Sequence, residues 1–154
     1  MKPQKFVITQ EGFDKLTQEL KELREVKKPA VLERLQKARE MGDLKENSEY
    51  HSAKESLRFI ESRMIWIEIR VRNADVVAKD ANHSIISLGD SVVLEQNGNT
   101  VDYQIVGELE ADIANKKLST NSPIGKAVFG KKVGDVVTVQ IPAGDVTYKI
   151  IKIS

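Results

Sequence analysis

The chain has 154 residues, no cysteine and a formal net charge of +1, and this length allows one ordinary domain or two small ones. The lack of cysteine excludes a disulfide framework, a cysteine-based zinc site and a thiol nucleophile, and the near-neutral charge argues against binding of duplex nucleic acid through bulk electrostatics. Charged residues make up 31% of the chain and aromatic residues 5%, a mixture typical of long solvated helices.

The N-terminal segment, residues 1–8, contains no apolar run long enough for a signal peptide. No other segment approaches the ~20 consecutive apolar residues that a membrane span requires. We therefore expect a cytoplasmic protein without a membrane partner.

The first predicted element is a helix that begins near Gln10, with Thr9 as its cap. Apolar residues then recur at spacings of three and four, but the repeat slips by one residue between Leu23 and Val31. Pro29 lies in this slip, and a proline inside a helix removes one hydrogen bond, so we expect a kink or bulge there. The apolar positions of this segment are Phe13, Leu16, Leu20, Leu23, Val31, Leu35 and Ala38.

A second helix is predicted after a short connection, residues 42–46. Its apolar residues alternate at spacings of three and four, which is the pattern of a coiled-coil seam. Each helical segment spans about 30 residues, or about 45 Å. Because the connection is so short, we expect an antiparallel hairpin with residues 42–46 at its tip. The seam positions are Tyr50, Ala53, Leu57, Ile60, Met64, Ile67, Val71 and Ala74.

The C-terminal half of the chain changes to short β-branched runs separated by glycine-containing turns. Within it, Ser122 and Pro123 fit the cap and the first residue of one short helix, and Gly130 fits its end. We therefore predict two domains, a coiled-coil hairpin over residues 1–78 and a small α+β domain over residues 79–154. The predicted strands are residues 91–96, 101–106, 136–141 and 146–153.

Acidic residues gather at the predicted tip, and two interpretations of them are open. Asp43 and Glu46 fit an aspartate version of the capping box, in which the first side chain caps the second helix and the other reaches back. Alternatively, the long arm carries both acids to a partner. Two carboxylates are too few to hold Mg²⁺, which takes six oxygen ligands, but they could complete a metal site that another molecule supplies.

The tip segment resembles the corresponding motif of the Gre transcript cleavage factors. Other segments that look like signatures of this family follow in family order, so the resemblance covers nearly the whole chain. The tip motif runs from Gly42 to Tyr50, with Ala38-Arg39 before it and Ala53-Lys54-Glu55 after it, and the other segments are Thr9 to Gly12, Lys15-Leu16, Ile105 to Gly107, Glu110 to Asp112, Ser122 to Ile124 and Gly130 to Asp135.

The resemblance implies that the hairpin enters the secondary channel of a backtracked bacterial RNA polymerase. There Asp43 and Glu46 are expected to help to bind a second Mg²⁺, shared with the polymerase active site, and its attacking water. The polymerase itself then cuts the nascent RNA 3′ end. The chain is accordingly expected to be an accessory factor rather than an enzyme, and to bind no metal by itself.

The resemblance also implies roles for basic residues and for the second domain. Arg39 and Lys54 are expected to contact phosphates of the extruded RNA, with Lys37 and Arg58 as further cations that could either join them or simply solvate the helices. The basic patch is small, which favours the A type of the family. The C-terminal domain, which resembles the FK506-binding fold, is expected to dock on the polymerase, with Ser122 and Pro123 as candidate docking residues that could also serve only to start the short helix.

Three other functions remain open at this level. A paralogue could enter the same channel and inhibit, although both tip acids are present. The second domain could be a prolyl isomerase, but Tyr103, Phe129 and Tyr148 are its only aromatic residues, and fold analogy alone supports that activity. A coiled-coil adaptor would dimerise, whereas a self-paired hairpin should be a monomer. His51 and His83 are expected to be ordinary surface histidines.

Overall fold

The computed structural model describes residues 5–154, which divide into two compact units. The helical unit contains Phe13–Asn73, and the sheet unit combines the described residues up to Gly12 with Ala74–Ser154. The sequence-based boundary between residues 78 and 79 thus lies beyond the end of the helical unit. No helix within the described part of the chain is long and apolar enough to cross a membrane.

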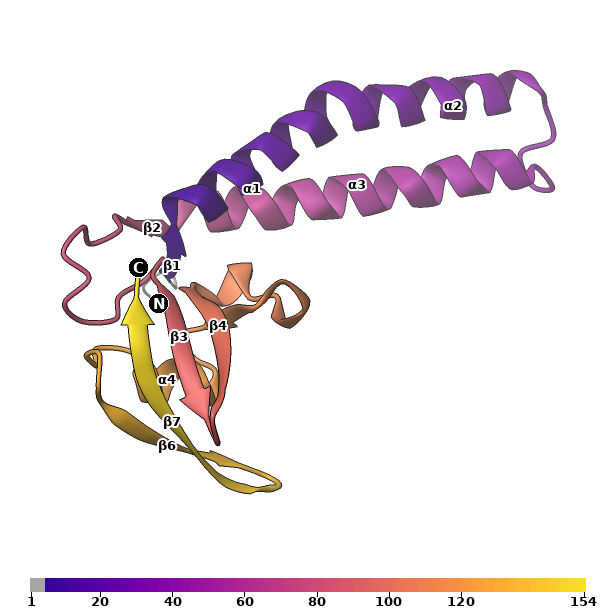
Figure 1. Ribbon diagram of the computed structural model, residues 1–154. Helices are drawn as coiled ribbons and strands as arrows, with labels where there is room; N and C mark the ends of the chain where they lie inside the picture. The colour runs from indigo at the N-terminus through magenta and orange to yellow at the C-terminus, as the bar shows by residue number, and fades with distance from the viewer. Residues whose placement is uncertain (1–4) are drawn as a thin grey trace. The chain divides into compact units, whose positions relative to one another are not determined.

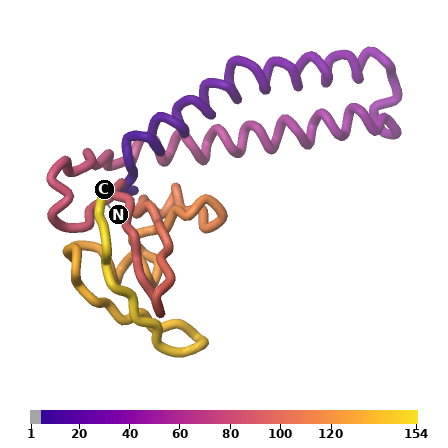
Figure 2. Tube along the Cα trace, in the orientation of Figure 1, coloured from indigo at the N-terminus to yellow at the C-terminus, as the bar shows by residue number. Residues whose placement is uncertain are grey.

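Two long helical segments run side by side in the helical unit (Figures 1 and 2). The first consists of α1 (Gln10–Glu22), a π-helical turn (Leu23–Lys27) and α2 (Lys28–Glu40), and α3 (Ser48–Arg72) returns along it. The predicted antiparallel hairpin is confirmed. The π turn widens the helix by one residue just before Pro29, which has no N–H to donate to the preceding turn. The expected bulge is confirmed.

The predicted seam positions of both segments are buried or half-buried. Leu23 and Val31 from the first segment form one apolar cluster with Ile60 and Ile67 from α3. The adaptor interpretation requires that the seam residues be exposed for pairing with a helix of another chain. Here the two helical segments of this chain cover the seam themselves. The structure therefore favours the self-paired hairpin.

Trp66 is half-buried on α3 between two arginines of the same helix. The guanidinium carbon of Arg70 lies 3.6 Å from its ring centroid and that of Arg63 lies 4.5 Å away. Arg63 also donates two hydrogen bonds, of 2.7 and 2.9 Å, to the carboxylate of Glu19 on α1. The cluster therefore ties α1 to α3 through a charge-assisted, bidentate pair.

The Glu19 carboxylate makes the stability of the helical unit dependent on pH. Its hydrogen bond with Arg63 lowers its pKa below the usual value of 4.5, so its stabilisation is present above that value and is lost as the pH falls through the folded-state pKa. Since both side chains are more than a third exposed, we expect at most about 1 kcal/mol. Denaturant unfolding followed by Trp66 fluorescence should show a smaller loss of stability between pH 6 and pH 3 in Glu19→Gln than in the wild type.

The sheet unit contains a five-stranded sheet in the order β5-β4-β3-β7-β6. Adjacent strands are antiparallel except β4 and β5, which are parallel. The four predicted strands are present, and β5 was not predicted from the sequence. The strands are β3 (Ser91–Gln96), β4 (Asn99–Val106), β5 (Lys117–Ser119), β6 (Val136–Ile141) and β7 (Gly144–Ile153).

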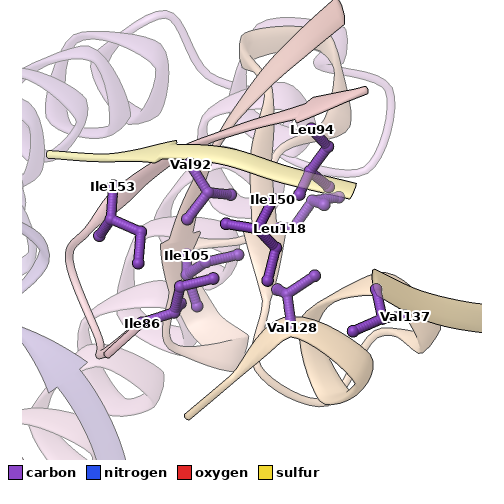
Figure 3. Packing of buried hydrophobic residues seen from close by; sticks show 9 residues of the cluster. All are labelled: Ile86, Val92, Leu94, Ile105, Leu118, Val128, Val137, Ile150 and Ile153. Atoms are coloured by element: carbon purple, nitrogen blue, oxygen red, sulfur yellow. The ribbon is translucent and has the colours of Figure 1, made fainter. Parts of the chain in front are cut away.

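One face of this sheet packs against α4 (Pro123–Val128). Figure 3 shows Val128 of α4 pointing toward Ile150 of β7, and both side chains are fully buried. As predicted, Ser122 caps α4, because its Oγ accepts the Gly125 N–H at 3.0 Å. The α+β architecture is therefore confirmed. The cluster contains Ile86, Val92, Leu94, Ile105, Leu118, Val128, Val137, Ile150 and Ile153.

A second, two-stranded sheet joins the two chain segments that make up the sheet unit. In it, β1 (Phe6–Thr9) pairs in parallel with β2 (Ala74–Val77). The Glu110 carboxylate bonds the backbone N–H and the hydroxyl of Thr9, and also accepts the Gly107 N–H at 3.2 Å. The Thr9 hydroxyl accepts the Gly12 N–H at 3.1 Å, so the predicted cap of α1 is confirmed. Glu110 thereby fastens the start of α1 within this unit.

The prediction for His83 was wrong. Its Nδ1 lies 3.0 Å from a carboxylate oxygen of Asp90, which is fully buried, and its side chain is only 32% exposed. The other Asp90 oxygen accepts both the N–H and the hydroxyl of Ser87 at 2.9 Å. His83 therefore helps to satisfy a buried carboxylate, which would otherwise be costly to desolvate.

Candidate functional site

The tip of the hairpin is a short loop between Glu40, the last residue of α2, and Ser48, the first of α3. Gly42 and Asp43 both have positive φ, +78° and +39°. The positive φ of Gly42 is the conformation that glycine favours directly after a helix. A positive φ is uncommon for Asp43, although aspartate tolerates it better than most residues do. The loop thus turns the backbone sharply at Asp43.

Asn47, and not Asp43, caps α3, so the capping-box interpretation of the two acids is wrong. The Asn47 side-chain oxygen accepts the Tyr50 N–H at 3.1 Å. Its amide nitrogen donates to the carbonyl of Ala38 on α2 at 2.7 Å and lies 3.5 Å from that of Gly42. This single side chain therefore satisfies backbone groups at both helix ends that meet at the tip.

The carboxylates of Asp43 and Glu46 are not engaged by any residue within the described range. Both are exposed, and within residues 5–154 neither carboxylate accepts a hydrogen bond or forms an ion pair. The third acid, Glu49, differs, because Arg34 on α2 donates two hydrogen bonds to it, of 2.7 and 3.0 Å. Asp43, Glu46 and Asn47 line one shallow hollow of about 280 Å³. The two predicted acids thus line the same hollow, and no residue that the structure describes engages either carboxylate.

The donor set of this hollow fits a metal ion only as a partial site. No group of three or more metal-binding side chains occurs in the described part of the chain. Two carboxylates leave most of the six oxygen positions of Mg²⁺ to be filled by water, substrate or another protein. The residues present therefore fit an ion held mainly by a partner.

The cations near the tip fall into two groups. Lys37 is occupied, because its ammonium bonds Glu33 at 2.7 Å on the same helix, and this hydrogen bond raises the pKa of Lys37 and lowers that of Glu33. Arg39, Lys54 and Arg58, in contrast, form no ion pair with any residue that the structure describes. The side chains of Arg39 and Lys54 both lie against the ring of Tyr50, at 5.8 and 5.4 Å from its centroid.

Ser122 and Pro123 lie at the start of α4 in the sheet unit. The Ser122 hydroxyl is used internally, since it donates to the Ser119 carbonyl at 2.7 Å and accepts the Gly125 N–H. Pro123 is exposed. Of the two predicted docking residues, only Pro123 therefore presents its side chain freely.

The aromatic residues that a proline-binding pocket would require are mostly engaged in packing. Tyr103 and Tyr148 are half-buried against the core of the sheet unit, and Phe129, 47% exposed, directly follows α4. Two of the three aromatic residues are thus used in the packing of the sheet unit.

Two sequence families match the chain and together cover most of it. One, "Transcription elongation factor, N-terminal", matches residues 6–76, and the other, "Transcription elongation factor, GreA/GreB, C-term", matches residues 81–154. The chain is 46% identical over 151 residues to transcription elongation factor GreA of Bacillus subtilis, covering 97% of this chain and 96% of that one. It is 47% identical over 152 residues to GreA of Lactococcus lactis subsp. lactis, with 96% and 97% covered.

Among solved structures, the chain is similar to GreA factor homolog 1 of Thermus thermophilus, with 29% identity, 98% of this chain and 99% of that chain covered, and a TM-score of 0.46.

Proposed function

The chain belongs to the GreA family of transcription elongation factors, and from this premise we propose that it stimulates RNA cleavage by a backtracked RNA polymerase. The observation that carries the proposal is that two acids at the tip have exposed carboxylates without a partner among the described residues. Of the three acids at or next to the tip loop, Arg34 pairs with Glu49, whereas no residue within 5–154 pairs with Asp43 or Glu46. Exposed carboxylates without a partner at the end of a long arm are suited to act in another molecule.

In this proposal the helical unit enters the polymerase channel, and Asp43 and Glu46 offer oxygen ligands at the active site. When bound there, a second Mg²⁺ would activate a water and stabilise charge on the phosphoryl group. Arg39 and Lys54 contact the phosphates of the extruded RNA, which adds affinity without reading sequence. The bond is cut by the polymerase, and this chain supplies ligands and positioning.

The decisive experiment is RNA cleavage in a stalled, backtracked elongation complex, with and without the protein. We expect shortening of 5′-labelled RNA to accelerate and elongation to resume from the new 3′ end. Binding without acceleration, together with slower elongation, would instead support an inhibitory paralogue.

We expect the double variant Arg39→Gln/Lys54→Gln to cleave poorly at low protein concentration and to recover at saturation. The two cations add affinity for RNA phosphates, whereas the acids remain in place, so the half-saturating concentration should rise about tenfold. A titration of cleavage rate against protein concentration measures this.

A matched control is Lys28→Gln/Lys37→Gln, which removes two cations that are paired with Glu61 and Glu33. Its half-saturating concentration should stay near that of the wild type. An equal rise in both variants would assign the effect to the net charge of the arm rather than to Arg39 and Lys54.

We propose further that the sheet unit docks on the polymerase through the surface around Pro123. Glutamate is tolerated in the first turn of a helix, so Pro123→Glu should leave α4 intact while it places a charge on this surface. We expect weaker binding to the polymerase core enzyme, measured by co-sedimentation, with an unchanged melting temperature. Ser122→Ala is the contrasting variant, because loss of its cap should lower stability by about 1 kcal/mol. Unchanged binding of Pro123→Glu would place the docking surface elsewhere.

A further inference from the structure

Tyr50 lies in the first turn of α3 and has no part in the proposed cleavage chemistry. The seam pattern predicts packing for it, and its side chain is indeed half-buried. Its ring, however, is also contacted by two cations. The guanidinium carbon of Arg39 lies 5.8 Å from the ring centroid, and the Lys54 ammonium lies 5.4 Å from it.

The two cations reach this ring from different helices, Arg39 from α2 and Lys54 from one turn further along α3. Neither forms an ion pair within residues 5–154, whereas most cations nearer the base of the hairpin do, among them Arg24, Lys28 and Arg63. Both cations contact the same ring. The negative charge of the aromatic π system attracts cations, so the ring is a physical reason for both side chains to lie where they do.

We propose that Tyr50 is a positioning residue that holds Arg39 and Lys54 as one preorganised site for RNA phosphates. This inference rests on the proposed function, because it deepens the role given there to the two cations. The ring is half-buried, and it limits the conformations of two long side chains that would otherwise be ordered only on binding. Ordering such side chains in advance lowers the loss of conformational entropy on binding. No acid among the described residues forms an ion pair with either cation, so a polyanion is the ligand that the pair fits.

The alternative is that Tyr50 only fills the seam, and two substitutions separate these roles. Tyr50→Phe keeps the aromatic face and removes the hydroxyl, whereas Tyr50→Leu keeps apolar bulk in the seam and removes the face. In cleavage titrations with a backtracked polymerase complex, Tyr50→Leu should raise the half-saturating concentration about threefold to tenfold, with an unchanged plateau. Tyr50→Phe should keep the half-saturating concentration of the wild type.

A spectroscopic readout tests the contact without polymerase. In the full-length protein, the side-chain protons next to the Lys54 ammonium should resonate upfield of those of Lys28, which is paired with Glu61 instead of a ring. The shift should persist in Tyr50→Phe and vanish in Tyr50→Leu. If the wild type shows no such shift, the proposal is overturned whether or not Tyr50→Leu folds.

Met64→Ala controls for a weaker seam, because Met64 lies further along α3 and packs against the apolar cluster of the hairpin. It should lower the melting temperature and leave the half-saturating concentration unchanged. Equal cleavage titrations for wild type and Tyr50→Leu would overturn the proposal. Absence of stimulated cleavage by the wild type would instead overturn the proposed function, while the Lys54 spectrum would still decide whether Tyr50 holds the cation.

Discussion

Replacing Asp43 by Asn, or Glu46 by Gln, is expected to reduce stimulated cleavage by on the order of 100-fold at saturating protein, because each change removes one anionic oxygen ligand at the reacting centre. The half-saturating concentration should stay the same, since the cations and the sheet unit are untouched. This combination, a lower plateau with unchanged affinity, is the signature of an interaction that acts in the reaction itself. Single-turnover cleavage measured across a range of protein concentrations gives both values.

The amide substitutions are preferable to alanine for a structural reason. Asp43 has φ +39°, a conformation that asparagine adopts more readily than alanine, so Asn keeps the loop while removing the charge. Since neither carboxylate has a partner within the described residues, the free energy of unfolding should change by less than about 0.5 kcal/mol. Activity and stability are therefore expected to separate.

Glu49→Gln is the matched control, because Glu49 is also a tip acid but is paired with Arg34. It should cost only an exposed ion pair, about 0–1 kcal/mol, and retain cleavage. If Glu49→Gln lost as much cleavage as the other two variants, the negative charge of the tip as a whole would be responsible, and the assignment to Asp43 and Glu46 would be wrong.

The elements that the sequence predicted best are those that depend on local spacing. Apolar residues at spacings of three and four predict both helices of the hairpin. The one-residue slip around Pro29 predicts a kink or bulge, which is present as the π turn, because a missing N–H acts on the turn just before it. The cap of α4 at Ser122 likewise depends on neighbours within three residues. Such signals are contained in a short window of sequence.

The elements that the sequence did not predict depend on contacts between distant residues. Phe6 pairs with Ala74 in the two-stranded sheet, and the Glu110 carboxylate bonds Thr9 across 101 positions. Neither pairing leaves a local pattern. For Glu110 the only signal was its place in a segment that resembles a family signature.

At the site, the sequence located the tip but could not decide which residue caps α3. Asp43 and Asn47 are both residue types that cap helices, and each is followed closely by an acid. The bond from the Tyr50 N–H to the Asn47 side-chain oxygen, which forms only once the helices are in place, settles the matter. Likewise, the ion pair between Arg34 and Glu49 crosses the hairpin, so only the packing of the helices shows which two acids are free.

Asn47 is therefore expected to control the geometry of the acids that flank it, and Asn47→Asp should lower the cleavage plateau about tenfold or more, because small displacements of reacting groups are costly. Aspartate keeps the oxygen that accepts the Tyr50 N–H, and its charge suits a helix N-terminus. It loses the N–H₂ group that donates to the Ala38 carbonyl at 2.7 Å. Helix α3 should thus remain capped while the tie between the two helix ends is broken.

Asn47→Ser separates the lost donor from the added charge, since serine also caps helices well but is too short to replace the amide at Ala38. We expect a similar fall in plateau for both variants, an unchanged half-saturating concentration, and melting temperatures close to that of the wild type. Raised Mg²⁺ should not restore the plateau of Asn47→Ser, because its two acids are intact and only their placement has changed. Full cleavage by both variants would show that Asn47 is only a helix cap and that the turn at Gly42 and Asp43 holds the acids without it.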